Sequence, residues 1–155
     1  MNISFPKVAR ILIVDDLPAN VRLLEQMLNT AGYTGVSSTM DPREVVELHR
    51  QNAYDLILLD LMMPGMDGFA VLEGLKALDP EGYVPVLVIT AQPNHKLRAL
   101  EAGAKDFISK PFDLVEVRTR IHNMLEVRLL YRALAEQNAR LEQAVLTLPG
   151  TPQIR

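Results

Sequence analysis

The chain contains no cysteine, and this absence excludes several kinds of chemistry at once. Disulfide bonds, thiolate nucleophiles and thiolate metal sites all require that residue. An excess of basic charge is lacking too, because the formal net charge is −3. A negative net charge gives no general attraction for nucleic acid or for an anionic membrane. We therefore expect neither of them as a direct partner.

Long hydrophobic runs are also missing. No apolar stretch approaches the roughly 20 residues that a membrane-spanning helix needs. Residues 1–7 lack the basic segment followed by an apolar segment that is typical of a secretory signal peptide. Hydrophobic residues make up 48% of the 155 residues and charged residues 23%, as in ordinary globular proteins. These features predict one cytoplasmic domain with an appendage.

Strand-like and helix-like segments alternate along the chain. The predicted strands cover residues 11–14, 34–39, 56–59, 85–90 and 107–109. Apolar residues at helical spacing follow each of them, and capping boxes at Asp41 with Glu44 and at Asp113 with Glu116 open the second and fifth helices. Such alternation predicts an α/β fold with an open, largely parallel sheet covered on both faces. In these sheets ligands bind beyond the carboxyl ends of the strands.

Acidic residues stand directly after two of the most apolar predicted strands. Asp15 and Asp16 follow residues 11–14, and Asp60 follows residues 56–59. Three carboxylates at one sheet edge repel one another unless a cation lies among them. Mg²⁺ prefers one or two carboxylates together with phosphate oxygens. The pattern therefore predicts a divalent-metal site with one carboxylate to spare.

Two further strand ends carry polar side chains, Thr90 and Lys110. The Asp60 carboxylate can attack a phosphoryl group without a general base, because it is already ionised at neutral pH. A metal ion and the Lys110 ammonium would offset the charge of the transferring phosphoryl, and the Thr90 hydroxyl would donate to one of its oxygens. Taken singly, each residue is as well explained by a turn, a cap or a solvated loop. Their joint placement at strand ends favours phosphoryl chemistry.

These motifs resemble the receiver domain of two-component response regulators. The matching residues, within about residues 8–126, are Asp15-Asp16, Asp60-x-x-Met63-Pro64-x-x-x-Gly68, Thr90-Ala91 and Lys110-Pro111. The resemblance implies a flavodoxin-like three-layer fold with strand order 2-1-3-4-5. It also implies that Asp60 accepts a phosphoryl group from a sensor histidine kinase, from a phosphotransfer protein or from a small phosphodonor.

The resemblance also implies roles for the surrounding residues. The implied ligands of Mg²⁺, for which Mn²⁺ can substitute, are Asp15, Asp16, Asp60 and the backbone carbonyl of Met62. The implied phosphoryl-stabilising residues are Lys110, Thr90 and Ala91. Thr90 and Phe107 would change conformation together on phosphorylation, and the peptide bond before Pro111 would be cis. The surface of the fourth helix, fifth strand and fifth helix would then change shape. Such a domain is not an enzyme, since it promotes only its own phosphorylation and dephosphorylation.

The fifth predicted helix is longer than a receiver domain requires. We expect residues 127–148 to form a helical extension and residues 149–155 a disordered tail. A heptad pattern places Met124, Tyr131, Asn138 and Val145 at a, and Val127, Leu134, Leu141 and Leu148 at d. The pattern predicts a coiled-coil homodimer, in which an asparagine at a favours one register. The alternative is a linker to an output domain, for instance one that makes or degrades cyclic di-GMP.

The remaining ionisable side chains indicate no second site. Three histidines are scattered over predicted helices, and we expect them to be solvated: His49, His95 and His122. Four arginines give the last helix a partly basic face: Arg118, Arg120, Arg128 and Arg132. We expect acids on the same helix to offset that charge.

Two other functions fit the same fold class. A phosphatase of the haloacid-dehalogenase type also forms an aspartyl phosphate, but it places a second acid two residues after the nucleophile, where this chain has Met62. A flavin-binding electron carrier would need a serine-, threonine- or glycine-rich phosphate loop after the first strand. This chain has Asp15-Asp16-Leu17-Pro18 there, which would repel a phosphate. The phosphatase remains the alternative to the receiver.

Overall fold

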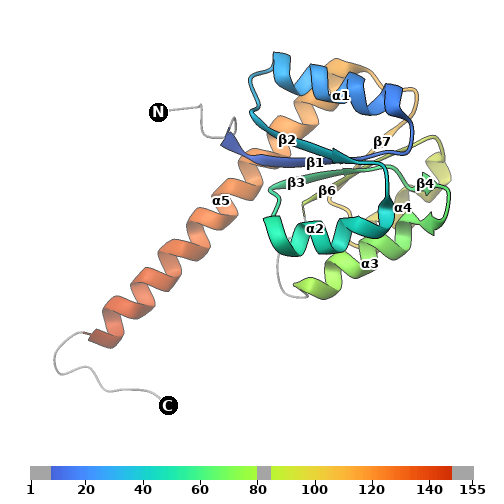
Figure 1. Ribbon diagram of the computed structural model, residues 1–155. Helices are drawn as coiled ribbons and strands as arrows, with labels where there is room; N and C mark the ends of the chain where they lie inside the picture. The colour runs from blue at the N-terminus through green and yellow to red at the C-terminus, as the bar shows by residue number, and fades with distance from the viewer. Residues whose placement is uncertain (1–7, 80–84, 148–155) are drawn as a thin grey trace.

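A computed structural model describes residues 8–79 and 85–147, in which five parallel strands form a sheet between two layers of helices (Figure 1). The strands are β1 (Arg10–Val14), β2 (Gly35–Thr39), β3 (Leu56–Leu59), β6 (Val86–Thr90) and β7 (Asp106–Ser109). Their order is β2-β1-β3-β6-β7, and all four neighbouring pairs are parallel. The predicted order 2-1-3-4-5 is confirmed, with β6 and β7 as the fourth and fifth strands.

Helices cover both faces of the sheet. The helices are α1 (Pro18–Thr30), α2 (Val45–Asn52), α3 (Gly68–Leu78), α4 (Lys96–Glu101) and α5 (Leu114–Thr147), with short 3₁₀ turns at Pro42–Glu44 and Pro93–His95. Alternate residues of a strand point to opposite faces. In β1, Ile11 and Ile13 accordingly pack with α1 and α5, whereas Leu12 and Val14 pack with α2, α3 and α4. The continuous apolar runs reflect this burial on both faces.

Asp41 and Asp113 act as caps, as predicted, although Asp41 caps the 3₁₀ turn before α2 rather than α2 itself. The side chains of Asp41 and Asp113 accept hydrogen bonds from the backbone N–H of Arg43 (3.0 Å) and Val115 (2.8 Å). The glutamates of the two predicted capping boxes have other partners. Glu44 accepts from the Thr39 hydroxyl at 2.8 Å, and Glu116 pairs with Arg120 at 3.2 Å. Nearby side chains thus replace the reciprocal half of each box.

A small antiparallel hairpin follows β3 and was not predicted. Its strands are β4 (Met62–Met63) and β5 (Met66–Asp67), and Gly65 between them has φ +87°. At Gly68 the chain passes so close to Leu61 that a Cβ atom would lie 2.5 Å from the Leu61 Cα. This close approach fixes the path of the chain directly after Asp60.

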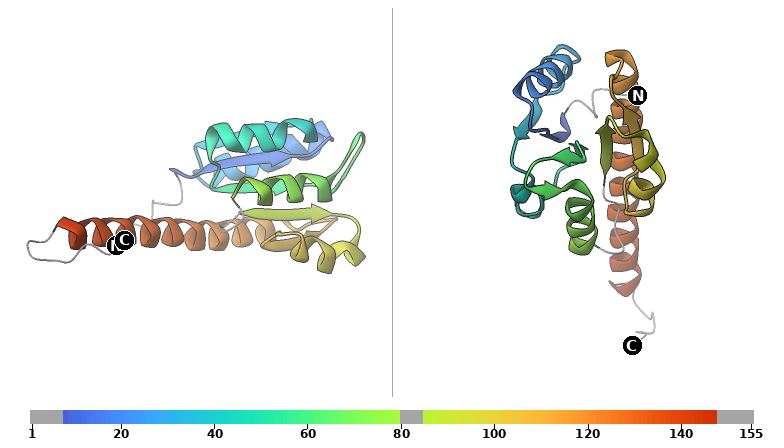
Figure 2. Two further views of the ribbon diagram at one scale, coloured as in Figure 1. Left: turned by 90° about the horizontal axis from the view of Figure 1, so that it is seen from below. Right: turned by 90° about the vertical axis from the view of Figure 1, so that its right-hand side faces the viewer.

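Helix α5 has a buried first part and a projecting second part (Figure 2). Its buried residues end at Leu129, and every residue from Leu130 to Thr147 is exposed. Met124, predicted at heptad position a, packs in the core with an exposed fraction of 8%, so it is not part of a free seam. Leu148 and the predicted tail, residues 149–155, lie outside the described residues. Among the helices described, none combines the length and apolarity needed to cross a membrane.

Candidate functional site

Three carboxylates lie together at the carboxyl ends of the two central strands. Asp15, Asp16 and Asp60 each offer an oxygen, and these oxygens all lie within 4.8 Å of one another. The pairing of β1 with β3 extends one step further, because the N–H of Asp60 donates to the carbonyl of Val14 at 3.0 Å. The parallel register therefore brings together acids that are far apart in the sequence.

Lys110 joins the acids from the neighbouring end of β7. Its Nζ lies 3.0 Å from Asp60 Oδ2 and 3.2 Å from Asp15 Oδ2. Its backbone N–H donates to the carbonyl of Thr90 at 2.8 Å, and the Lys110–Pro111 peptide bond is cis. One ammonium group thus bridges two of the three carboxylates.

Backbone donors hold the carboxylates in place. Asp15 Oδ1 accepts from the N–H of Leu17 at 3.0 Å, and Asp60 Oδ1 accepts from the N–H of Met62 at 3.0 Å. The side-chain amide of Asn20 also donates to Asp15 Oδ2 at 3.3 Å, a contact that the sequence analysis missed. Asp15 and Asp60 are buried, whereas Asp16 is half-buried. The site is therefore preorganised and open on the Asp16 side.

Burial sets the electrostatics of the site. Removal from water raises the pKa of Asp60 above its ordinary value, and the charge of Asp15 adds to the rise. The N–H of Met62 and the Lys110 ammonium oppose it. Burial lowers the pKa of Lys110, but its contacts with Asp60 and Asp15 outweigh this, so the net shift is upward. A divalent cation among the acids would favour the ionised form of Asp60.

The predicted switch residues lie on the two strands next to this cluster. Thr90 is fully buried at the end of β6, and its hydroxyl accepts a hydrogen bond from the N–H of Gln92 at 3.4 Å. Phe107 on β7 is 6% exposed and belongs to the core that contains Phe69 and Val88. Ala91 is exposed directly after Thr90. The Phe107 ring therefore occupies an inward position in this structure.

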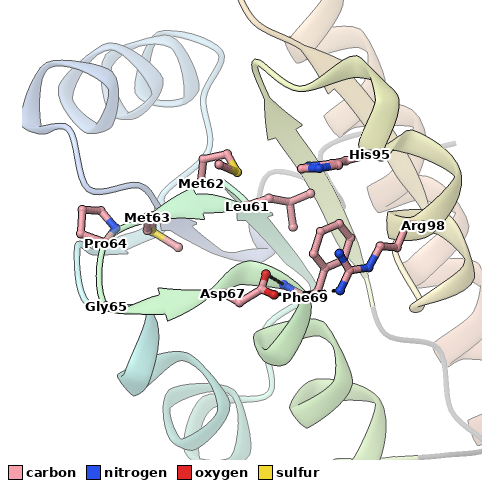
Figure 3. A pocket seen from close by; sticks show the side chains of 9 residues that line it. All are labelled: Leu61, Met62, Met63, Pro64, Gly65, Asp67, Phe69, His95 and Arg98. Carbon is pink, nitrogen blue, oxygen red and sulfur yellow. Dashed lines mark hydrogen bonds and ion pairs between the residues drawn. The ribbon is translucent and has the colours of Figure 1, made fainter.

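A cavity of about 630 Å³ adjoins the loop after Asp60 (Figure 3). Its lining residues are Leu61, Met62, Met63, Pro64, Gly65, Asp67, Phe69, His95 and Arg98. The Arg98 guanidinium carbon lies 3.8 Å from the centre of the Phe69 ring, and its Nη2 is 4.0 Å from Asp67 Oδ2. The His95 ring meets the edge of Phe69, and its Nδ1 is buried. His95 was expected to be solvated, but its ring packs against Phe69 instead. These contacts connect the start of α4 with the start of α3.

The arginines of α5 are paired differently from the prediction. Arg120 bonds Asp106 at 2.7 Å as well as Glu116. Arg132 Nη1 lies 2.6 Å from Asp55 Oδ1, and Arg128 Nε lies 3.9 Å from the same oxygen. The expectation that acids of the same helix would offset these charges is therefore wrong for Arg128 and Arg132. Asp55 was missed because nothing in its spacing indicates a partner so far along the chain.

Comparison with known proteins identifies the family. The family model of the response regulator receiver domain matches residues 11–122. This chain belongs to the response regulator receiver family. It is 43% identical over 133 residues to the response regulator PleD of Caulobacter vibrioides, a match that covers 84% of this chain and 29% of PleD. It is 38% identical over 141 residues to the DNA-binding regulator RpaA of Synechocystis, covering 90% of this chain and 58% of RpaA.

Solved receiver structures have the same fold. The receiver domain of the sensor histidine kinase PA1611 from Pseudomonas aeruginosa, which has a magnesium ion coordinated in its active-site cleft, is 30% identical with a TM-score of 0.69. That match covers 77% of this chain and 98% of the PA1611 domain. Receiver domains act in two-component signalling with histidine kinases or phosphotransfer proteins, and they bind Mg²⁺ in an acidic pocket. In this chain the pocket is the cluster of Asp15, Asp16 and Asp60.

Proposed function

We propose that this receiver accepts a phosphoryl group on Asp60, in a Mg²⁺-dependent reaction with a sensor histidine kinase or a phosphotransfer protein. The observation that carries the proposal is the position of the Asp60 carboxylate. One of its oxygens lies 3.0 Å from the Lys110 ammonium, and the carboxylate also belongs to a cluster of three acids. A nucleophile, a fixed cation and a place for a second cation are therefore together.

The donor set fits a hard divalent cation. Asp15, Asp16 and Asp60 would hold Mg²⁺ or Mn²⁺ together with the Met62 carbonyl, since carboxylate, carbonyl and water oxygens are the ligands that such ions prefer. When bound, the ion would supply positive charge next to the transferring phosphoryl group. The Met62 N–H already bonds Asp60 Oδ1 at 3.0 Å, so its backbone lies beside the acid.

The transfer needs little from the protein beyond position and charge. An oxygen of the Asp60 carboxylate forms a bond to phosphorus, the N–P bond of the donor phosphohistidine breaks, and the donor imidazole leaves. Lys110, Thr90 and the backbone N–H of Ala91 would donate hydrogen bonds to the phosphoryl oxygens as charge develops on them. Met62 stands where a haloacid-dehalogenase-type phosphatase would need an acid, so an external phosphate ester is the less favoured substrate.

Phosphorylation would act as a local charge switch. An acyl phosphate adds nearly two negative charges and three acceptor oxygens at the end of β3. The Thr90 hydroxyl would exchange the N–H of Gln92 for one of those oxygens, and Phe107 would follow on the neighbouring strand. The surface formed by α4, β7 and α5 would then favour a second conformation.

The projecting part of α5 supports a homodimer. Apolar side chains there are more than half exposed, at 60% for Leu134, 57% for Leu141 and 51% for Val145, and Val127 just before it is 53% exposed. A single helix with this much apolar surface gains stability by pairing. Asn138 lies at position a within the same seam, where it would favour a parallel dimer in one register. We propose a coiled coil over residues 127–147, without Met124.

Intact mass spectrometry after incubation with acetyl phosphate tests the phosphoacceptor. We expect one phosphoryl adduct in the wild type, no adduct in Asp60→Asn, and no adduct when EDTA removes divalent ions. Asp79→Asn, at the exposed carboxyl end of α3, is the matched control and should carry the adduct. Equal adducts in Asp60→Asn and wild type would contradict the proposal. Repeated hydrolysis of p-nitrophenyl phosphate by the chain would instead favour a phosphatase.

A further inference from the structure

Strand β3 has an aspartate at each end. Asp60 follows its last residue at the phosphoacceptor site, and Asp55 precedes its first residue at the opposite edge of the sheet. Asp55 is only 3% exposed. Its Oδ2 accepts from the N–H of Arg10 at 3.0 Å, and its Oδ1 lies 2.6 Å from Arg132 Nη1. A buried carboxylate of the sheet thus bonds a side chain of α5.

This contact stands where α5 leaves the domain. Leu129 is the last buried residue of the helix, and the exposed part begins at Leu130. Arg128 and Arg132 are four residues apart and therefore lie on one face of the helix. Both lie toward Asp55, at 3.9 Å for Arg128 Nε and 2.6 Å for Arg132 Nη1.

Leu129, which is 5% exposed, is the last apolar side chain that packs α5 against the domain here. A hollow of about 280 Å³ separates the start of β1 from α5, and its lining includes Val8, Asp55, Arg132 and Glu136. Val8 is 70% exposed, so it does not close the hollow. A tightly packed contact would fix the angle of the helix by shape alone. Beyond Leu129, the ion pair of Arg132 with Asp55 is a short contact between α5 and the sheet.

We propose that Asp55 and Arg132 form an anchor that sets the direction in which the extension of α5 leaves the receiver. Arg132 is a positioning residue in this proposal, and it touches no part of the phosphoacceptor site. Asp55 also donates its backbone N–H to the carbonyl of Arg10 at 2.8 Å, so the anchor is fixed to β1 as well as β3. These two strands carry the acidic cluster at their other ends.

Arg132 offers the cleaner substitution. Its side chain is 47% exposed, whereas the Asp55 side chain is 4% exposed, so Arg132→Gln should leave the domain folded. Arg132→Lys keeps the positive charge but replaces the planar guanidinium by a single ammonium group. Arg140→Gln, two turns further along the exposed part of α5, removes an equal charge without touching Asp55 and is the matched control.

Distances between two spin labels measure the direction of the helix. The chain has no cysteine, so Glu73→Cys on α3 and Gln143→Cys on α5 give two defined labels. Mixing with an excess of unlabelled chain restricts the measurement to distances within one chain. We expect a narrow distribution in the wild type and in Arg140→Gln, and a distribution about twice as wide in Arg132→Gln, because the released helix end fluctuates. Arg132→Lys should lie between them. A distribution in Arg132→Gln that matches the wild type would overturn the proposal.

A second measurement connects the anchor with signalling, and this step rests on the proposed function. We expect beryllofluoride and Mg²⁺ to change the dimer affinity of the wild type. Arg132→Gln should take up the phosphoryl group as the wild type does, but its dimer affinity should not change. A ligand-dependent change in Arg132→Gln equal to that of the wild type would contradict this role. If the wild type itself takes up no phosphoryl group, the proposed function fails, while the label distances still decide the anchor.

Discussion

Replacing Lys110 should affect phosphoryl transfer and metal binding in opposite directions. Its ammonium lies between Asp60 and Asp15, at 3.0 Å and 3.2 Å. We expect Lys110→Gln to slow phosphorylation by acetyl phosphate by about 10²–10³-fold, the usual cost of losing one preorganised donor to a developing charge. Mg²⁺ should bind more tightly by roughly tenfold, because a neighbouring positive charge has gone.

Isothermal titration of Mg²⁺ and the rate of adduct formation measure these two effects separately. Lys76→Gln, an exposed lysine on α3, is the control and should change neither. Weaker Mg²⁺ binding in Lys110→Gln would show that the lysine helps to build the metal site rather than competing with the ion.

His49 makes the stability of the domain depend on pH. Its Nδ1 accepts from the N–H of Tyr54 at 3.2 Å. Burial lowers the pKa of His49, as does the charge of Arg128, while Asp55 opposes the shift. The folded state therefore prefers the neutral ring. Its contribution is present above the unfolded pKa of about 6.5 and is lost as pH falls from there through the folded value.

Urea denaturation at about pH 7.5 and about pH 5.5, on either side of the unfolded histidine pKa, checks this expectation. The free energy of unfolding should fall more for the wild type than for His49→Gln, whose side-chain oxygen can still accept from Tyr54. His122, which is half-buried and pairs with Glu126 at 3.1 Å, provides the control through His122→Gln. Equal losses in the wild type and His49→Gln would rule out the buried ring as the cause.

At the residue scale, Asp15, Asp60 and Lys110 lie together as expected because each directly follows a strand of the parallel sheet. Parallel strands present their carboxyl ends at one edge, so position in the chain translates into position in space. Asp55 and Arg132 are separated by 77 residues, and only the packing of α5 against the sheet decides that they meet. No local pattern contains that information.

Among the elements, the junction of β3 with α3 tolerates the least change. A Cβ atom on Gly68 would lie 2.5 Å from the Leu61 Cα and 2.9 Å from the Leu61 carbonyl oxygen. Neither backbone atom can move aside without shifting the residue next to Asp60. We expect Gly68→Ala to lower the free energy of unfolding by about 1–3 kcal/mol, as overpacking commonly does, and to slow phosphorylation.

Chemical denaturation and the rate of adduct formation measure both effects of Gly68→Ala. Glu73→Ala, an exposed position on the same helix, should change the free energy of unfolding by no more than about 0.5 kcal/mol. A Gly68→Ala variant as stable as the wild type would show that α3 can slide away from Leu61.

The elements that were predicted and those that were missed differ in length. Apolar runs such as Leu56–Leu59 and the helical spacing in α1 and α3 gave correct types, because burial on a sheet face imposes a period. The hairpin of β4 and β5 has two residues in each strand, which is too short for any period. The predicted helix 94–102 is only Lys96–Glu101 after a 3₁₀ turn, since fraying at helix ends leaves no trace in composition.

The molecule consists of a globular receiver domain and an exposed helical extension, and the two parts differ in where their apolar side chains lie. The core side chains, the last of which is Leu129, are buried within one chain. Beyond that point Leu134, Asn138 and Leu141 are exposed, and the proposed coiled coil would cover them. The heptad pattern predicted this seam but also included Met124, because a residue that faces the sheet has the same helical spacing as one that faces a partner.

A double substitution in the seam tests the dimer at this scale. We expect Leu134→Glu with Leu141→Glu to weaken dimerisation by at least about 10²-fold, since each change removes roughly 1.5–3 kcal/mol of apolar burial and introduces like charges across the interface. Sedimentation equilibrium measures the dissociation constant. Ala139→Glu, on the outer face of the same turn, adds a charge outside the seam and should leave it nearly unchanged. If the wild type and both variants sediment as monomers, the homodimer is wrong and the seam has another partner. If all three form equally stable dimers, the interface lies on the receiver itself, at the surface of α4, β7 and α5.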